Sequence, residues 1–435
     1  MNLNSLIARA KEMGFEGIEV NYHKTISNTI RVFQRKVMNV ESKDSQSFNV
    51  RSIYEGKVSK MYFENDRQDV YYVLNHLKQN ALVNNSGDST EIFKGSKEYL
   101  KKPSTKSDIN DKTMKEKVDL LLELEKKCYE KDSRVANVNY CLYTESISHS
   151  KLINSEKLSL SDSEIYAYYT VGVIVKEGDV VKTNFDVLAF NNFSKINVDA
   201  FIEKLVQEGI DKLSSVEPVT GKVPVVIRNT AVCQLLEYFS KQFCGDQLKV
   251  HLTPYEGKEH TQIANKMVNL IEDPLCTLSL NKQIYDSEGV ATSYKKVIEN
   301  GIFNGFIFDI KNARALNRES TGNATGRGAG FTNLVLQAGD HDLNELMADI
   351  TEGLLITDVW AFHAGGNVIN GVFNLPACGY VIKNGKLAGA IDQVVLSGTF
   401  SNILNDVCKI GKDSKWGLGS TIAPSITIKE LTVSK

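Results

Sequence analysis

Two side chains in the last quarter of the chain are of the types that could act as a nucleophile and its base. Cys378 stands in a PACG segment, and His363 precedes it by fifteen residues in an FHAG segment. A histidine can activate a neighbouring thiol if the fold brings the two within hydrogen-bond reach and lowers the thiol pKa. We therefore take Cys378 and His363 as candidate catalytic residues, with a purely structural role for both as the alternative.

A glycine-rich stretch before them has the composition of a shaped binding loop. Four glycines fall within the nine positions 322–330, and glycine permits positive φ angles and close approach of backbones. The alternating apolar run 331–336 predicts a strand, whose edge could pair with an extended peptide. The side chains expected to line such a substrate or partner groove are Asn323, Arg327, Thr332 and Asn333. Two alternatives stay open: the polar strand residues could face solvent, and the arginine could pair with an acid of its own chain.

The sequence contains no familiar metal-ligating motif. Its seven histidines are followed by Lys, Leu, Ser, Leu, Thr, Asp and Ala, so no His-Glu dipeptide exists, and neither HExxH nor HExxxH can occur. The seven cysteines are scattered and never form CxxC. His251 and His260 lie nine positions apart around a proline and a glycine, a pattern more typical of surface histidines than of a metal site. The glycines match neither the dinucleotide-binding pattern nor the Walker A pattern. Because these patterns and the metal-ligating motifs are all missing, we expect no metal and no cofactor.

Composition limits the class of protein. The 435 residues are 42% hydrophobic and 24% charged, which is typical of a soluble globular chain with two or three domains. The net charge of −2 gives no indication that nucleic acid is the main partner, and no apolar run is long enough to span a membrane. The first residues predict an amphipathic helix with interspersed charges, which differs from a signal peptide. With unpaired, scattered cysteines, we expect a cytoplasmic protein.

The first half of the chain alternates helices and strands. Apolar periodicity predicts helices at 2–13, 69–82, 115–129 and 198–213. Alternating runs predict strands at 17–22, 29–40, 138–143, 152–154, 165–176 and 180–190, and strands within 47–62 joined by a hairpin turn at Glu55-Gly56-Lys57. The polar stretch 84–112 separates two segments of similar order and is expected to be a linker or surface loop that proteases cut first. An internal duplication would explain this order, although residue identities are too weak to establish it.

The second half is expected to be dominated by strands. A strand at 223–227 leads into a helix at about 230–243, and Asn384-Gly385 between two apolar runs predicts a tight hairpin turn. Positions 1–220 hold eight glycines, whereas 301–435 hold eighteen, as expected for a β domain with many tight turns. We predict an α+β protein with an N-terminal α/β domain at 1–220 and a glycine-rich β domain at 221–435. The first domain could comprise two sub-units, 1–83 and 113–220.

Several segments of the second half resemble the TldD/PmbA family. They are GRGAGFTNLVLQAG at 326–339, GLLIT at 353–357, GVFNLPACGYVIKNGKL at 371–387, VVLSG at 394–398 and PSITI at 424–428. Family members are described either as modulators of DNA gyrase or as metalloproteases. The family has a protease branch with a zinc site and a PmbA/TldE-type branch without one. The resemblance extends over essentially the whole chain and is most specific after residue 320.

The zinc-bearing branch carries HExxxH on the helix after the first C-terminal strand, and its third zinc ligand is a cysteine near the C-terminus. This chain has LLEYFSK at 235–241 in that place. The register that the resemblance implies puts Glu237 at the family glutamate, with Leu236 and Lys241 at the histidines. Cys408 is the counterpart proposed for the cysteine. A leucine cannot ligate zinc and a lysine ammonium would repel it, so the chain most resembles the PmbA/TldE-type branch.

The resemblance implies a non-catalytic subunit that pairs with a TldD-type zinc metalloprotease. Such a subunit would bind or position unfolded peptides for proteolysis in the cytoplasm, as part of a homo- or heterodimer. Whether the chain is an enzyme by itself stays open. One alternative is a metal-independent hydrolase that uses Cys378 and His363. Another is a peptide-binding homodimer without a protease partner.

The missing histidines make a direct prediction about metal content. We expect the purified and dialysed protein to hold no stoichiometric zinc, because Leu236 and Lys241 provide no ligands. Elemental analysis by mass spectrometry measures this. Zinc at close to one ion per chain that persists through dialysis would contradict the register proposed for this helix.

Overall fold

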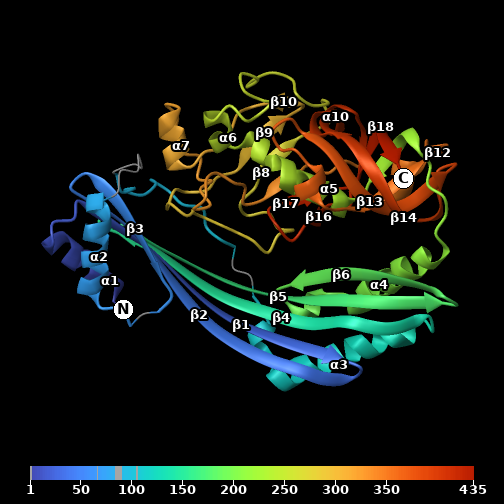
Figure 1. Ribbon diagram of the computed structural model, residues 1–435, viewed down its shortest axis with the longest axis horizontal. Helices are drawn as coiled ribbons and strands as arrows, with labels where there is room; N and C mark the ends of the chain where they lie inside the picture. The colour runs from blue at the N-terminus through green and yellow to red at the C-terminus, as the bar shows by residue number, and fades with distance from the viewer. Residues whose placement is uncertain (1, 66, 84–90, 104–105) are drawn as a thin grey trace. The chain divides into compact units, whose positions relative to one another are not determined.

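The computed structural model describes residues 2–65, 67–83, 91–103 and 106–435, and the chain forms two compact units (Figure 1). The first unit comprises 1–98 and 104–209, and the second comprises 99–103 and 210–435. Both combine helices with largely antiparallel sheets, which confirms the predicted α+β class. Over the described ranges, no helix is both long and apolar enough to cross a membrane.

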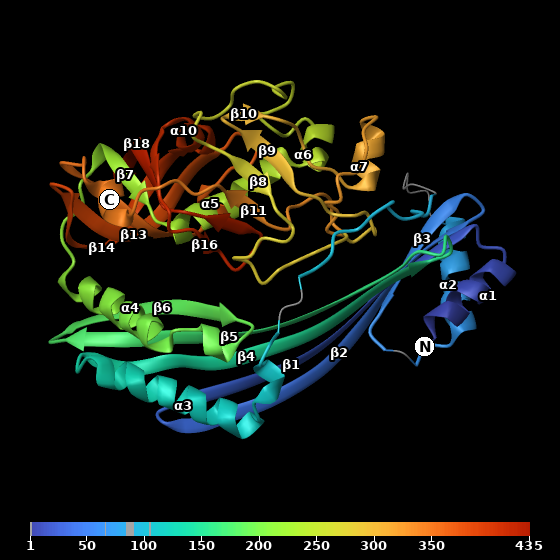
Figure 2. The ribbon, with the colours of Figure 1, turned by 180° about the vertical axis from the view of Figure 1, so that it is seen from behind.

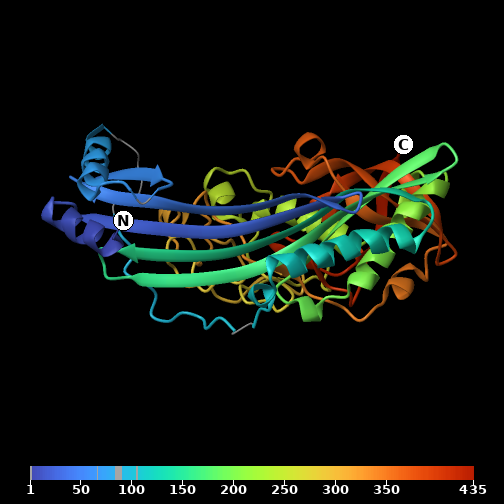
Figure 3. The same cartoon turned by 90° about the horizontal axis from the view of Figure 1, so that it is seen from below.

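The first unit is built on one antiparallel sheet with the strand order β3-β2-β1-β4-β5-β6. Four of its strands have 17 to 20 residues, much longer than the usual strand of about six. The strands are β1 Gly17–Phe33, β2 Lys36–Tyr54, β3 Lys57–Phe63, β4 Val135–Asn154, β5 Ser159–Glu177 and β6 Val180–Phe190. The helices are α1 Leu3–Glu12, α2 Val70–Val83, α3 Met114–Lys131 and α4 Val198–Asp211. Figures 2 and 3 show α1 and α2 at one end of the strands and α3 and α4 at the other.

The order of elements repeats within this unit. A helix, three strands and a helix occur twice, first as α1-β1-β2-β3-α2 and then as α3-β4-β5-β6-α4. The two sets meet at the centre of the sheet, where β1 pairs antiparallel with β4 from Glu19 opposite Asn154 to Arg31 opposite Leu142. The predicted sub-units 1–83 and 113–220 therefore contribute to a single sheet.

One predicted strand crosses a turn. The expected strand at 29–40 is wrong in this respect, because β1 ends at Phe33 and β2 begins at Lys36. Gln34 and Arg35 form the turn with φ angles of 51° and 60°. Neither glycine nor asparagine, which usually mark such turns, is present there. The Glu125 carboxylate on α3 accepts the Arg35 backbone N–H at 2.7 Å and so holds the turn, a long-range contact that the sequence does not indicate.

Each end of the first unit has its own packing. At one end, Leu6 and Ala10 of α1 and Leu74 and Leu77 of α2 are buried against the sheet. At the other end, α3 places Lys117 against β4, where its Nζ lies 2.6 Å from Glu145 Oε2. Both side chains of this ion pair are at most 5% exposed.

The second unit contains two six-stranded sheets, ordered β10-β9-β8-β11-β17-β16 and β14-β13-β12-β7-β18-β15. The first sheet consists of β8 Leu270–Glu272, β9 Lys295–Glu299, β10 Ile302–Phe303, β11 Leu334–Leu336, β16 Lys415–Trp416 and β17 Thr421–Ala423. The second consists of β7 Gly221–Ile227, β12 Glu352–Val359, β13 Val372–Lys383, β14 Lys386–Thr399, β15 Val407–Ile410 and β18 Ile426–Ser434. The helices are α5 Asn229–Phe239, α6 Gly245–Lys249, α7 Ile310–Ala315, α8 Leu343–Met347, α9 Phe362–Gly365 and α10 Phe400–Asn405.

Local signals predicted parts of this unit well. The Asn384-Gly385 turn is confirmed, with φ angles of 49° and 74° between β13 and β14. The predicted helix at 230–243 is α5 followed by a 3-10 turn, Ser240–Phe243. The predicted strand at 331–336 is shorter, because β11 begins only at Leu334.

Part of the polar stretch 84–112 lies outside the described residues, namely 84–90 and 104–105. Tyr99–Pro103 groups with the second unit, where the Tyr99 hydroxyl donates to the Gly289 carbonyl at 2.8 Å. Ile92 is buried with Ile53 and Val58 in the first unit. The described part of this stretch is thus anchored at two points, and its sensitivity to proteases stays a prediction.

The buried Lys117–Glu145 ion pair predicts that removing its lysine lowers the free energy of unfolding much more than removing an exposed lysine does. We expect Lys117→Met to destabilise the protein by about 3 to 5 kcal/mol, because it leaves the Glu145 charge buried without its cation. Denaturant titration measures the free energy of unfolding. The control is Lys126→Met on the same helix, where the lysine is 49% exposed and faces Glu123 at 3.5 Å. Equal effects of the two substitutions would show that the buried pair has no special weight.

Candidate functional site

Helix α5 follows the first strand of the second unit and organises the loops around it. It begins directly after β7, which pairs parallel to β12, as in a strand–helix–strand crossover. Its inner face carries the apolar residues Val232, Leu235, Leu236 and Phe239, all buried in the main core. The Leu236 side chain therefore packs inside the unit.

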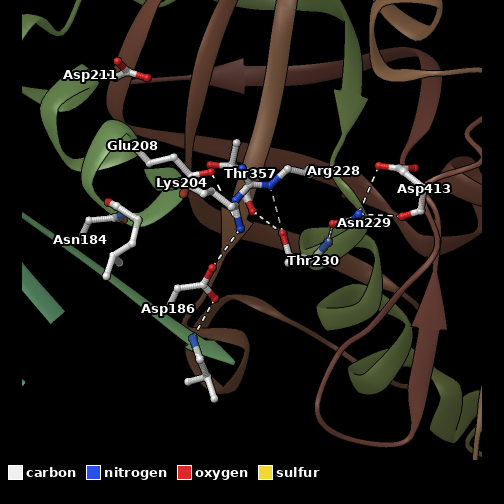
Figure 4. Close-up of polar contacts among 12 residues, drawn as sticks. Asn184, Asp186, Lys204, Glu208, Asp211, Arg228, Asn229, Thr230, Thr357 and Asp413 are labelled. Atoms are coloured by element: carbon white, nitrogen blue, oxygen red, sulfur yellow. Dashed lines mark hydrogen bonds and ion pairs between the residues drawn. The ribbon is translucent and has the colours of Figure 1, made fainter. Parts of the chain in front are cut away.

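The N-terminal end of α5 is fastened to the C-terminal segment of the chain. Asn229 Nδ2 donates to the Asp413 carbonyl at 2.8 Å, and the Asn229 backbone N–H donates to Ser425 Oγ at 3.0 Å. Ser425 Oγ in turn donates to Asp413 Oδ2 at 2.6 Å. Thr230 Oγ1 donates to the Thr357 carbonyl of β12 at 2.9 Å (Figure 4). These bonds hold the start of the helix against β12 and against the loops that contain Asp413 and Ser425.

Three other polar side chains of α5 hold strand β12 and two loops. Gln234 Nε2 donates to Asp358 Oδ1 at 2.6 Å, and the Tyr238 hydroxyl donates to the Gly366 carbonyl at 2.9 Å. Glu237 accepts both the backbone N–H of Ser420 at 2.8 Å and its hydroxyl at 2.9 Å. The Glu237 carboxylate is thus used to fix the loop that contains Ser420.

The other two residues expected at metal-ligand positions, Lys241 and Cys408, are both exposed and lie on different elements. Lys241 is exposed on the 3-10 turn after α5. Cys408 is exposed on β15, and its thiol donates to the Asp406 carbonyl at 3.5 Å. Throughout the part of the chain that the structure describes, no three side chains of His, Cys, Asp or Glu converge in a way that could hold a metal ion.

The structure does not join Cys378 to His363. Cys378 lies on β13 with its Sγ 3.7 Å from Thr357 Oγ1, and burial raises the pKa of its thiol. A raised pKa is the opposite of what a thiolate nucleophile needs. His363 on α9 is exposed and forms no hydrogen bond with any described residue. The two candidates therefore lack the contact that would let one activate the other.

The glycine-rich stretch forms a small hairpin. Ala324 and Ala329 bridge at its base, and the Thr325 backbone N–H donates to the Gly328 carbonyl at 2.9 Å across its tip. Gly322 precedes the hairpin with φ of +71°, and a Cβ there would collide with the Ala291 carbonyl. Glycine at 322 is therefore required both by the backbone angle and by the close approach of a neighbouring segment.

Two buried carboxylates hold this hairpin from inside. Glu272, at the end of β8, accepts the Thr332 N–H at 3.0 Å and Asn323 Nδ2 at 3.1 Å. Asp286 accepts the Ala324 N–H at 2.9 Å. Burial raises the pKa of both acids, to about 6 for Asp286, while the nearby Lys295 ammonium opposes the shift. Neither acid belongs to a sequence motif, so pattern analysis missed both.

These bonds determine where the four predicted groove residues lie. Asn323, Thr332 and Asn333 are buried, and they bond to Glu272 or its neighbours. The expectation of an open strand edge is wrong, because β11 pairs with β8 on one side and with β17 on the other. Arg327 alone projects outward, at the hairpin tip. It forms no hydrogen bond or ion pair with the residues that the structure describes.

Comparison with known proteins identifies the family. The description "PmbA/TldA metallopeptidase C-terminal domain" matches residues 220–435, and "PmbA/TldA metallopeptidase central domain" matches residues 107–213. The chain belongs to the PmbA/TldD family. The two matches together cover most of the chain, including helix α5 and the glycine-rich hairpin.

Relatives in the PmbA/TldD family carry different names. A metalloprotease PmbA homolog of Buchnera aphidicola is 24% identical over 66% of this chain, and the match spans 64% of that relative, slightly less than two thirds. A zinc metalloprotease TldD homolog of Saccharolobus solfataricus is 23% identical over 98% of both chains.

Solved structures share the fold. A Thermotoga maritima protein described as a modulator of a DNA gyrase matches with a TM-score of 0.92, 25% identity and 99% coverage of both chains. TldE of Thermococcus kodakarensis matches with a TM-score of 0.90, 23% identity and full coverage of both chains. The second likeness establishes a common fold and no more.

Some relatives in the PmbA/TldD family are named as zinc metalloproteases. In this chain, the residues at the corresponding site do not form a set of zinc ligands. Leu236 has no donor atom and is buried in the core. The Glu237 carboxylate already accepts two hydrogen bonds from Ser420, and Lys241 is a cation. Zinc in proteins is held by thiolate, imidazole and carboxylate ligands, usually four in number. This helix provides one carboxylate, which is already occupied.

The buried Asp286 predicts a pH dependence of stability. Its pKa in the folded protein is about 6, against about 3.9 in an unfolded chain. Because the folded state binds the proton more tightly, the protonated acid stabilises the fold below about pH 4, and this contribution is lost as the pH rises through 6. The shift corresponds to roughly 3 kcal/mol. Denaturation of Asp286→Asn between pH 4 and 7 should lack that loss.

The exposed Asp340→Asn substitution is the control for removal of a charge alone. We expect its stability to follow the pH curve of the unmodified protein. A curve for Asp286→Asn that is parallel to that of the unmodified protein would show that Asp286 does not titrate differently on folding.

Proposed function

We propose that this protein is a non-catalytic, TldE-like subunit that pairs with a zinc-bearing TldD-type protease and positions unfolded peptides for cleavage. The observation that carries the proposal is the state of helix α5. Where the resemblance places two zinc-binding histidines, the chain has a core leucine, Leu236, and an exposed cation, Lys241. The intervening Glu237 fixes a loop through Ser420.

The proposed peptide contact is Arg327. Its hairpin is held by the buried acids Glu272 and Asp286, so the backbone beneath the side chain is fixed. The guanidinium is exposed and lacks an intramolecular acid among the described residues. A planar guanidinium with several donors suits a carboxylate or a peptide carbonyl of a bound chain. In this proposal Asn323, Thr332 and Asn333 support the hairpin from within instead of touching the substrate.

The compartment and the class of partner follow as parts of the same proposal. All seven cysteines are free, as expected in the reducing cytoplasm. The net charge of −2 favours a protein or peptide partner over DNA. A hydrolase that uses Cys378 is not favoured, because burial raises the pKa of its thiol and no histidine or carboxylate among the described residues is hydrogen-bonded to it.

Co-purification with a TldD-type relative, followed by peptide cleavage by each component alone and by the pair, tests the subunit role. We expect cleavage by the pair and none by this protein alone. Arg327→Ala should weaken peptide binding to the pair by at least about tenfold. Its melting temperature should match that of the unmodified protein, because the guanidinium forms no hydrogen bond or ion pair with the described residues. Lys266→Ala, another exposed cation of the second unit, is the matched control.

Two results would contradict this scheme. Cleavage by the isolated protein that thiol alkylation abolishes would establish a hydrolase of another kind. A fall in melting temperature for Arg327→Ala with unchanged peptide binding would give the arginine a structural role instead.

A further inference from the structure

Four asparagines of this chain are followed directly by glycine, and all four are exposed residues of the second unit. They are Asn300, Asn304, Asn370 and Asn384. Asparagine is a thermolabile residue, and a following glycine exposes its side-chain amide to attack, because no Cβ shields the glycine nitrogen. Exposure alone does not distinguish the four sites, so the state of the glycine nitrogen decides which of them can react.

At three of these sites the glycine nitrogen is engaged in a backbone hydrogen bond. The N–H groups donate from Gly301 to the Val268 carbonyl at 3.0 Å, from Gly371 to the Asn367 carbonyl at 2.9 Å and from Gly385 to the Ile350 carbonyl at 2.9 Å. A nitrogen in such a bond cannot approach the asparagine Cγ until the bond opens, and opening it costs free energy. The fold therefore protects these three sites.

The fourth glycine, Gly305, has a different environment. Its N–H forms no hydrogen bond with any residue that the structure describes. The Asn304 side chain is held in one orientation, because its Nδ2 donates to the Lys296 carbonyl at 3.0 Å. Its Oδ1 accepts no hydrogen bond within the described ranges. This site thus combines an exposed amide with a nucleophile that needs no bond to be broken first.

We propose that Asn304 is the residue of this protein that deamidates in the folded state. The Gly305 nitrogen gives its proton to a solvent base and forms a bond to Asn304 Cγ. The Cγ–Nδ2 bond breaks, and Nδ2 leaves as ammonia, so that a cyclic succinimide remains. Water then opens the ring at one of its two carbonyl groups and yields aspartate or isoaspartate. In sum, one water is consumed and one ammonia is released, with no oxidant or reductant.

The local structure demands the glycine that makes Asn304 reactive. Gly305 has a φ angle of 144°, which favours glycine, and a Cβ there would lie 2.8 Å from Glu259 Oε1. The Glu259 carboxylate is itself held by the Arg318 guanidinium, through hydrogen bonds of 2.8 and 2.5 Å. A side chain at position 305 would therefore strain both the backbone and this ion pair.

Isoaspartate at position 304 changes the packing of the second unit. In isoaspartate the main chain runs through Cβ and Cγ, which lengthens the backbone by one carbon. Phe303 and Phe306 on either side are 0% and 5% exposed, and both belong to the main core. A longer connection between two buried rings displaces at least one of them. The modified protein is therefore less stable, and this inference does not depend on the proposed peptide-binding role.

Peptide mapping by mass spectrometry after incubation at mildly alkaline pH tests the choice of site. The deamidation rate of each Asn-Gly pair is measured in the folded protein and divided by its rate in denaturant, which corrects for the preceding residue. We expect this ratio to be at least about threefold higher at Asn304 than at each of the other sites, because only there is no hydrogen bond lost. A ratio at Asn304 that does not exceed the others would overturn the proposal.

Two variants test the consequence of the reaction. Asn304→Gln removes the site, since glutamine cyclises much more slowly through a larger ring. Asn370→Gln is the matched control, at an exposed asparagine whose following glycine is hydrogen-bonded. During incubation, the unmodified protein and Asn370→Gln should gain isoaspartate, measured by isoaspartate-specific methylation, and a fraction with a lower melting temperature. Asn304→Gln should gain neither.

Two results of this comparison would contradict the inference. Equal gain of isoaspartate in Asn304→Gln and in the unmodified protein would place the reaction at another residue. Gain of isoaspartate at position 304 with an unchanged melting temperature would show that the core around Phe303 and Phe306 absorbs the longer backbone.

Discussion

The second unit depends on two acids that are shielded from water, Glu272 and Asp286. Removing a carboxylate from solvent costs free energy unless donors satisfy it. Here the donors are backbone N–H groups of the glycine-rich stretch, at Ala324 and Thr332 among others. The acids therefore dictate the path of that stretch. Gly322 is required on a separate ground, since its backbone passes too close to the Ala291 carbonyl for any side chain.

Helix α5 connects the strands and loops around it through its polar side chains. Its polar residues are directed at three loops, through Asn229, Glu237 and Tyr238, and at strand β12, through Gln234. A side chain whose polar atoms already form structural hydrogen bonds cannot also act as a proton acceptor or a metal ligand. The helix therefore holds the surrounding segments in place, and Glu237 provides part of this support through Ser420.

The first unit raises a different physical problem. Its central strands are far longer than the elements beside them. For example, β3 pairs with only the last seven residues of β2. A repeated helix–strands–helix order accounts for the central pairing of β1 with β4, and it places a third strand of each set at the outer edges of the sheet. The long strand β2 beside the short edge strand β3 leaves the outer edge of 36–47 without a strand partner among the described residues.

The sequence by itself determined what depends on near neighbours. The helix of Leu6 and Ala10, the Asn384-Gly385 turn and the absence of zinc-binding histidines are all legible within a few positions, since periodicity, turn chemistry and ligand type are local properties. Only the tertiary structure decided that Asn333 is buried and that Arg327 is exposed, with no hydrogen bond or ion pair to the described residues. Both outcomes depend on Glu272 and Asp286, which bond to this stretch across 61 and 38 positions and carry no motif. Burial and pairing between such distant segments are set by packing, which residue patterns do not record.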